Sequence, residues 1–286
     1  MKLLIFSDID GTFLNHDNYS MGTLFKYIKN LNMDFEVIFN TSKTYEETVK
    51  INKKLQLNFP FIVENGACIF FPKNYLNENF KKKKILWYKD HLCYKISRLK
   101  PNKVINLLRN FRKKYSFKFY NELSDNELKN ITQLKISDIR LSKNRQFSNP
   151  IFWMDTSKKK ETFKKEFCLL NTGFLISDGG RFLHVLDKCD KGVALQKFLK
   201  IINLKKNSYE TISLGDSEND IPMLELTNFA CIIKSNKSKK LSLKNKKIYR
   251  SNQTAPDGWK ESLEHVLSKE KINFWFLSKW YSSDTS

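Results

Sequence analysis

The chain has 286 residues, 41% of them hydrophobic, and its 51 Lys and Arg against 30 Asp and Glu give a net charge of +21. It contains no apolar run of about 18 residues and no signal-peptide pattern after Met1, so we expect a cytoplasmic protein without a membrane partner. The five cysteines form no C-x-x-C pair, which argues against a zinc site and against a disulfide framework.

The first part of the chain alternates apolar runs with amphipathic segments. Buried strands are expected at residues 3–6, 35–39 and 61–63, with a shorter candidate at 68–71. Helices are expected between them, at residues 21–31 and 45–55. This alternation predicts an α/β fold built on a Rossmann-like parallel sheet.

The same alternation returns in the last third of the chain. Helices are expected at residues 191–201, at 221–226 and from Asp257 onward, and strands at 211–214 and 229–233. Beyond the last helix, Phe274, Trp275 and Phe276 are expected to pack on the core. Both ends of the sequence therefore contribute to one core domain.

The residues between these parts have a different character. A basic helix is expected at 94–114, shorter helices at 126–134 and 137–143, and strands at 151–154 and 182–186. This pattern indicates a mixed α/β domain inserted into the first one. We therefore assign residues 1–84 and 188–286 to the core, the latter with a C-terminal extension, and residues 85–187 to the insert.

The first strand ends in a pair of carboxylates. Asp8 closes the apolar run, Asp10 follows, and Gly11-Thr12 turns the chain away. Ligands of open α/β sheets bind at the carboxyl ends of strands, and two carboxylates so close repel each other unless a cation neutralises them. The pattern D-x-D-G-T-x-L therefore favours a Mg²⁺-assisted aspartyl nucleophile over a turn that happens to hold two Asp residues.

Together with residues 8–12, three later segments at expected strand ends or helix starts form a set of four short motifs. They are residues 8–12 (DIDGT), 41–43 (TSK), Lys191 and 215–220 (GDSEND). In this order they resemble the four motifs of the haloacid dehalogenase-like phosphatases. The distance between the second and third motifs puts the insert there, which in this family implies a mixed α/β cap that selects the substrate.

The resemblance implies a role for each motif residue. Asp8 attacks phosphorus and forms an aspartyl-phosphate, and Asp10 acts as general acid and then general base. Thr41 donates its hydroxyl to a phosphoryl oxygen, and Lys191 offsets the charge of the transferring group.

The same resemblance implies Mg²⁺ as the cofactor. Carboxylates, carbonyls and water are the ligands that Mg²⁺ prefers. The expected metal site comprises the carboxylates of Asp8 and Asp216, the main-chain carbonyl of Asp10, and Asp220, which holds a coordinated water.

Further segments resemble the mannosyl-3-phosphoglycerate phosphatase branch of the family. They are residues 40–44 (NTSKT), 60–67 (PFIVENGA), 145–150 (RQFSNP), 179–185 (GGRFLHV), 214–224 (LGDSENDIPML) and 256–259 (PDGW). The products of this branch are glycosylglycerates, a class of compatible solutes. Asn149 stands where the branch usually has an acidic residue, so a glucosyl in place of a mannosyl substrate stays open.

Such a substrate carries a phosphate, a carboxylate and a hydroxyl-rich sugar. Binding such a substrate requires hydrogen-bond donors such as Arg and Lys side chains. The candidate binding residues are Ser42, Lys43, Arg145, Ser148, Arg181 and His184. Hydrolysis of sucrose phosphate or of sugar phosphates in general is the alternative within the same superfamily.

The high positive charge also suggests a hypothesis from another functional class, in which the protein is a non-catalytic nucleic-acid-binding module. The cations are mostly Lys and are spread along the chain, with runs at 81–84, 158–160 and 234–247. This distribution favours solvated lysine faces, which would attract an anionic substrate, over a specific nucleic-acid partner. We expect a monomer or a homodimer.

Overall fold

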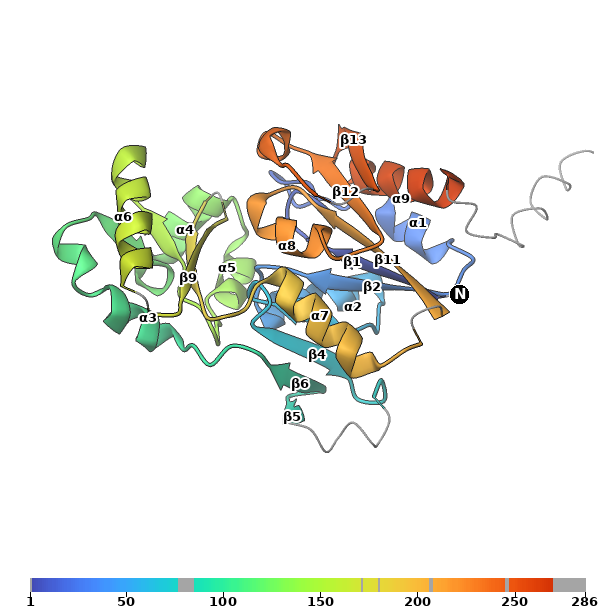
Figure 1. Cartoon of the computed structure of the whole chain (residues 1–286), viewed down its shortest axis with the longest axis horizontal. Helices are drawn as coiled ribbons and strands as arrows, with labels where there is room; N and C mark the ends of the chain where they lie inside the picture. The colour runs from blue at the N-terminus through green and yellow to red at the C-terminus, as the bar shows by residue number, and fades with distance from the viewer. Residues whose placement is uncertain are drawn as a thin grey trace, which may run out of the picture.

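The computed structural model describes residues 2–76, 85–170, 172–179, 181–205, 208–244 and 247–269. They form a core, at the right of Figure 1, and an insert at its left. The core contains one large sheet, in the order β13-β12-β11-β1-β2-β3-β4-β6-β5. Its strands are β1 (Lys2–Ser7), β2 (Phe35–Asn40), β3 (Phe61–Val63), β4 (Cys68–Pro72), β5 (Ile85–Tyr88), β6 (His91–Lys95), β11 (Tyr209–Gly215), β12 (Phe229–Lys234) and β13 (Ile248–Thr254).

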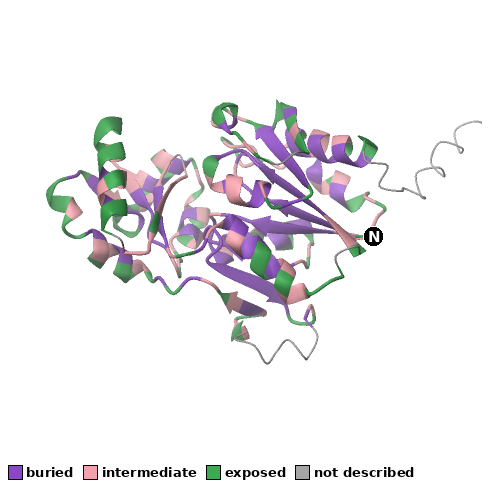
Figure 2. Cartoon of the chain, in the orientation of Figure 1, coloured by how far each residue is buried: buried purple, intermediate pink, exposed green. Residues whose placement is uncertain are grey.

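The central strands are parallel, as expected, and the β4-β6-β5 edge is antiparallel. Helices cover both faces of the sheet: α1 (Leu24–Lys29), α2 (Tyr45–Leu55), α7 (Lys191–Ile202), α8 (Ile221–Leu224) and α9 (Asp257–Lys269). Alternate β1 residues therefore enter different cores. Leu3 and Ile5 pack with α1 and α9, whereas Leu4 and Phe6 pack with α7 and α8. Burial on both faces explains the continuous apolar run of β1, and Figure 2 shows the sheet as the buried centre of the core.

The insert is a smaller α/β layer structure. Its antiparallel sheet has the order β7 (Phe117–Phe119), β8 (Ile151–Trp153), β10 (Leu183–Leu186) and β9 (Leu175–Asp178). Its helices are α3 (Pro101–Leu108), α4 (Asp125–Thr132), α5 (Ile136–Ser142) and α6 (Ser157–Leu169). α3 and α6 share one apolar cluster, and α4 and α5 share another. Short 3₁₀ turns lie at Phe111–Lys113, Tyr120–Glu122, Glu218–Asp220 and Ser238–Lys240.

The beginning of the insert differs from the sequence prediction. Residues 85–95, which we assigned to the insert, form β5 and β6 and extend the core sheet through β4. The expected helix at 94–114 is wrong in its first part, because α3 begins only at Pro101. Proline at the first helical position disfavours helical geometry in the residue before it, and Lys100 is extended.

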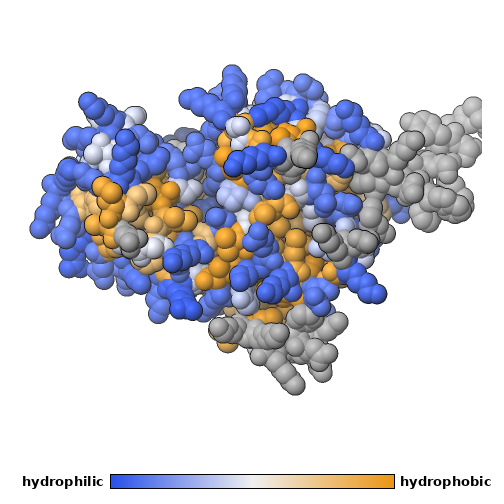
Figure 3. Space-filling model, in the orientation of Figure 1, coloured by the Kyte–Doolittle hydropathy of each residue, from blue (hydrophilic) through white to orange (hydrophobic). Residues whose placement is uncertain are grey.

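The surface carries most of the excess charge. Figure 3 shows hydrophilic side chains over most of the face in view, with smaller hydrophobic patches on the insert and the core. Lys158, Lys159, Lys239 and Lys240 are exposed members of the basic runs. The run at 81–84 and the aromatic segment at 274–276 lie outside the described residues. Among those described, no helix has the length and apolarity needed to cross a membrane.

Candidate active site

The motif segments meet at one edge of the core sheet. β11, β1 and β2 are neighbouring parallel strands, so their carboxyl ends lie side by side. β1 leads into Asp8, β2 into Thr41 and β11 into Asp216. The fourth segment arrives from α7, whose cap residue Asp190 accepts a hydrogen bond from the Val193 amide and places Lys191 in the first turn. This is the edge where open α/β sheets bind their ligands.

Three buried carboxylates gather there around one lysine. Asp8, Asp216 and Asp220 each offer an oxygen within 4.8 Å of the others. The fully buried Lys191 Nζ lies 2.6 Å from Asp8 Oδ1 and 2.6 Å from Asp220 Oδ1. The other oxygen of Asp220 accepts the amides of Asp216 and Ser217, both at 3.0 Å. Asp220 is therefore fixed in place by the turn that it closes.

The cluster is short of positive charge. Burial, together with the neighbouring carboxylates of Asp220 and Asp216, raises the pKa of Asp8 to about 7 against the lowering effect of Lys191. Burial and Asp220 raise the pKa of Asp216 to about 6. Lys191 and Lys237, the latter acting on Asp216, bring two positive charges against three carboxylates, and oxygen ligands in this arrangement suit a hard divalent cation. The donor set therefore fits a metal site.

The turn after Asp10 requires glycine to make room for this cluster. Gly11 has a φ of +83°, and a Cβ at this position would lie 2.8 Å from Asp216 Oδ2. Such backbone angles are readily adopted only by glycine. The D-x-D-G pattern thus has a steric reason in addition to a chemical one.

Asp10 lies beside the cluster, with its carboxylate turned toward Lys43. Lys43 Nζ is 2.8 Å from Asp10 Oδ2 and 3.4 Å from Glu47 Oε1. Although burial lowers the pKa of Lys43, the charges of Asp10 and Glu47 raise it above its usual range. Asp10 Oδ1 is buried and has no hydrogen-bond partner in the described part of the chain. Asp10 therefore keeps one oxygen free for another group.

The loop after β2 is held by main-chain and side-chain hydrogen bonds. The buried Thr41 donates its amide to Ile62 O at 3.0 Å, and its hydroxyl accepts the Lys43 amide at 3.2 Å. Thr44 caps α2 in a reciprocal pair with Glu47. This cap also places Glu47 beside Lys43.

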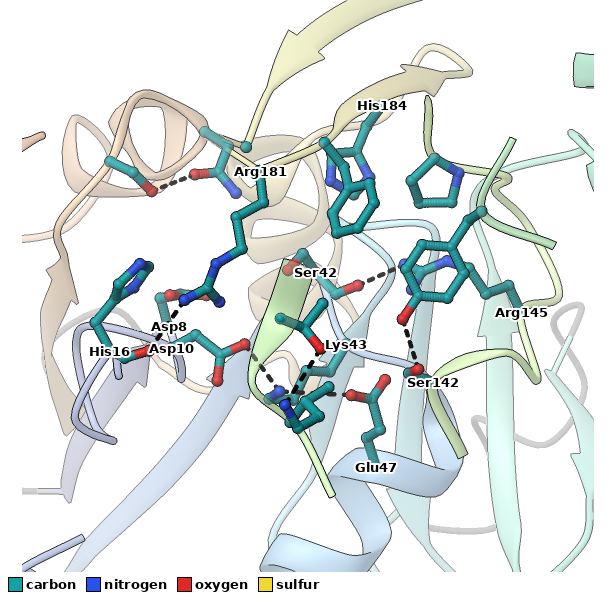
Figure 4. A pocket seen from close by; sticks show the side chains of 18 of the residues that line it. Asp8, Asp10, His16, Ser42, Lys43, Glu47, Ser142, Arg145, Arg181 and His184 are labelled. Atoms are coloured by element: carbon teal, nitrogen blue, oxygen red, sulfur yellow. Dashed lines mark hydrogen bonds and ion pairs between the residues drawn. The ribbon is translucent and has the colours of Figure 1, made fainter. Parts of the chain in front are cut away.

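A cavity of about 110 Å³ lies above these groups, between the core and the insert. Five of the predicted substrate residues line it, together with Asp8 and Asp10: Ser42, Lys43, Arg145, Arg181 and His184. Figure 4 shows them converging from both domains. Sequence reasoning missed other lining residues, among them His16, Tyr19, Tyr120, Asn219 and Lys237.

Ser148 does not line the cavity. It is buried, donates its hydroxyl to Glu64 Oε2 at 2.6 Å and accepts Arg145 Nε at 2.9 Å. Asn149 is also turned away, because its amide nitrogen donates to Asn121 Oδ1 within the insert at 2.9 Å. Both side chains serve to shape the 145–150 segment.

Arg181 and His184 approach the cavity from the insert. Arg181 donates to the Tyr19 hydroxyl at 3.0 Å and to His16 O at 3.3 Å, so it bridges to the core loop after β1. Burial and the nearby charge of Arg145 lower the pKa of His184 to about 3. His184 is therefore a neutral imidazole, and its buried Nδ1 lacks a partner among the residues described.

Comparison with known proteins agrees with this geometry. Residues 5–259 match the sequence profile of the haloacid dehalogenase-like hydrolase family. A glucosyl-3-phosphoglycerate/mannosyl-3-phosphoglycerate phosphatase of Persephonella marina is 31% identical over 93% of this chain and 98% of its own. The mannosyl-3-phosphoglycerate phosphatase of Pyrococcus furiosus is 32% identical over 82% of this chain and 91% of its own.

Solved structures share the fold at lower identity. The sucrose-phosphatase of Synechocystis, in complex with sucrose and phosphate, superposes with a TM-score of 0.62 at 15% identity, covering 94% of this chain and 98% of the other. A haloacid dehalogenase-like hydrolase of B. subtilis gives a TM-score of 0.62 at 17% identity, covering 94% and 100%. The sequence profile, the curated relatives and the converging motifs agree that this chain belongs to the haloacid dehalogenase-like hydrolases.

Proposed function

We propose that this phosphoric monoester hydrolase removes the phosphate from mannosyl-3-phosphoglycerate, or from its glucosyl analogue, and releases the glycosylglycerate, a compatible solute. One observation supports the proposal most strongly. Asp8 forms the floor of a cavity whose walls carry Lys43, Arg145 and Arg181. A carboxylate nucleophile thus lies below cations that would bind a substrate with both a phosphate and a carboxylate.

The metal would be Mg²⁺, held by the carboxylates of Asp8 and Asp216 and the main-chain carbonyl of Asp10, with Asp220 holding a coordinated water. When bound, it would neutralise phosphoryl oxygens and so make phosphorus open to an anionic nucleophile. Lys191 would hold Asp8 through Oδ1, which leaves Oδ2 for the attack.

The proposed reaction has two displacements. Asp8 Oδ2 forms a bond to phosphorus while the bond to the glycerate oxygen breaks, and Asp10 gives that oxygen its proton. Asp10 then takes a proton from water, whose oxygen attacks phosphorus and frees Asp8 as inorganic phosphate leaves. Asp10 Oδ1, which has no hydrogen-bond partner in the described part of the chain, supports this exchange, because it can bond to the leaving oxygen and then to water. The Thr41 hydroxyl would donate to the phosphoryl group.

Substrate entry requires the insert to move. A cavity of about 110 Å³ is smaller than ligand pockets of about 300 to 1,000 Å³. The insert is docked on the core through polar contacts, such as the Tyr19 hydroxyl to Thr132 O and the Thr44 hydroxyl to Leu141 O. We infer that this arrangement is a closed state, and that the insert opens to admit substrate.

The test is initial-rate phosphate release from mannosyl-3-phosphoglycerate, glucosyl-3-phosphoglycerate and sucrose 6-phosphate, with Mg²⁺ and with EDTA. We expect kcat/KM for one or both phosphoglycerates to exceed that for sucrose 6-phosphate by at least about 100-fold, or about 2.7 kcal/mol. EDTA should abolish all three rates. Equal rates on the three substrates would refute the proposed substrate class, and full activity in EDTA would refute the metal.

A further inference from the structure

A buried carboxylate that takes no part in these steps lies in the turn after β3. Glu64 is 1% exposed. It begins three consecutive residues with left-handed backbone, Glu64, Asn65 and Gly66, at φ values of 48°, 58° and 90°. Residues other than glycine keep this conformation only where their surroundings enforce it, and such strain clusters at functional sites.

The side chain of Glu64 holds a segment of the insert. Its Oε1 accepts the Gln146 amide at 2.8 Å, and its Oε2 accepts the Phe147 amide at 3.1 Å and the Ser148 hydroxyl at 2.6 Å. Arg145 Nε is 3.7 Å from the same Oε2. One core carboxylate thus satisfies two consecutive amides, a hydroxyl and a cation of the insert.

The backbone of the same turn holds the motif loops of the core. Glu64 donates its amide to Lys43 O, and Asn65 donates its amide to Thr41 O, both at 2.9 Å. The side chain of Asn65 accepts Asn219 Nδ2 at 3.0 Å. The position of Glu64 is therefore tied to the loop after β2 and to the loop that carries the metal-site aspartates.

Arg145 connects the core loop after β2 with residue Ser148 of the insert. Its Nη2 donates to Ser42 O at 2.6 Å, and its Nε donates to the Ser148 hydroxyl, which itself donates to Glu64. Figure 4 shows Arg145 reaching across to Ser42 at the wall of the cavity. We propose that Glu64 is a positioning residue: it docks residues 145–148 on the core and thereby orients Arg145 toward the anionic end of the substrate.

This inference rests on the proposed function, because it concerns the part of the substrate that the insert recognises. The competing reading is that Glu64 only stabilises the fold. A purely structural role predicts equal effects on every substrate. A positioning role predicts loss only for substrates that need Arg145, since a small phosphate ester reaches Asp8 without it.

The experiment compares Glu64→Gln with wild type on mannosyl-3-phosphoglycerate, glucosyl-3-phosphoglycerate and p-nitrophenyl phosphate. Gln keeps the shape but presents an amide NH₂ to groups that are themselves donors. The matched control is Glu36→Gln, which removes another buried carboxylate, paired with Lys2 and Tyr75 at 2.6 Å each. Thermal unfolding of each variant is measured in parallel.

We expect Glu64→Gln to lower kcat/KM for the better phosphoglycerate by about 100-fold, since misplacing a substrate-positioning group by about 1 Å costs this much. The value for p-nitrophenyl phosphate should stay within about threefold, and Glu36→Gln should not change the ratio between the substrates. Equal losses on both kinds of substrate, or no loss at all, would overturn the proposal.

Ser148→Ala provides a second route if Glu64→Gln does not fold. It removes the hydroxyl that joins Glu64 to Arg145 and should show the same substrate-selective loss; an unselective loss would count against the proposal. A wild type inactive on both phosphoglycerates would refute the proposed function separately. Glu64→Gln is then compared on the best sugar phosphate and on p-nitrophenyl phosphate, with the same two outcomes.

Discussion

Without the proposed divalent cation, the stability of this protein should fall as the pH rises from about 4 to about 8. In the metal-free fold the pKa of Asp8 is about 7 and that of Asp216 about 6, both raised from 3.8. At pH values between 3.8 and about 7, the folded state keeps protons on these carboxyl groups that the unfolded state has already released. The free energy of unfolding therefore decreases with rising pH across this window.

The size of the effect follows from the same values. The rise from 3.8 to about 7 for Asp8 corresponds to about 4 kcal/mol, and the rise to about 6 for Asp216 to about 3 kcal/mol. Because the two groups share one site, we expect a combined loss of several kcal/mol, a large part of the 5–15 kcal/mol typical of folded domains. A bound cation removes the repulsion, so its stabilising effect should be greatest at high pH.

The assay is urea unfolding at pH 5 and pH 8, in EDTA and in saturating MgCl₂. Comparing the two solutions at one pH cancels the contribution of groups outside the site. We expect Mg²⁺ to raise the free energy of unfolding by several kcal/mol more at pH 8 than at pH 5, and Asp216→Asn to reduce this difference. An equal Mg²⁺ effect at both pH values would refute the reasoning that the cluster is short of positive charge.

Three further predictions concern single residues. Lys191→Met leaves buried carboxylates unpaired. It should abolish phosphate release and lower the free energy of unfolding, measured in urea, by about 3–5 kcal/mol. An active, stable variant would contradict the contacts assigned to Lys191. Gly11→Ala places a Cβ 2.8 Å from Asp216 Oδ2. It should raise the Mg²⁺ concentration needed for half-maximal rate and lower the free energy of unfolding by more than about 1 kcal/mol. An unchanged Mg²⁺ dependence would refute the steric argument. Asn149→Asp should leave the ratio of mannosyl to glucosyl kcat/KM within about twofold, because Asn149 faces Asn121; a changed ratio would place it at the sugar.

Most of the core could be predicted because its strands are buried on both faces and read as continuous apolar runs. The start of the insert could not, because β5 and β6 join the core only through pairing with β4, and local periodicity carries no information on pairing partners. α6 was missed because its sequence is dominated by lysines, and only Phe163 and Phe167 pack inward. β13 was missed because most of its residues are polar and exposed.

In the candidate site, too, some residues could be predicted from the sequence and others could not. Asp8, Lys191, Asp216 and Asp220 could be predicted from short motifs, since each motif ends a strand or starts a helix at one sheet edge. The role of Ser148 could not, because its partner Glu64 lies on the other domain. The contacts of Arg181 with the loop after β1 likewise depend on docking of the insert, which sequence spacing does not reveal.

The most direct test of the proposed chemistry is phosphate release from mannosyl-3-phosphoglycerate and glucosyl-3-phosphoglycerate by wild type and Asp8→Asn in parallel, with Mg²⁺ and with folding verified. We predict turnover of at least one substrate by the wild type and none above background by Asp8→Asn, whose amide cannot form the acyl-phosphate. Comparable turnover by the two proteins would contradict Asp8 as the nucleophile, and with it the mechanism proposed for this site.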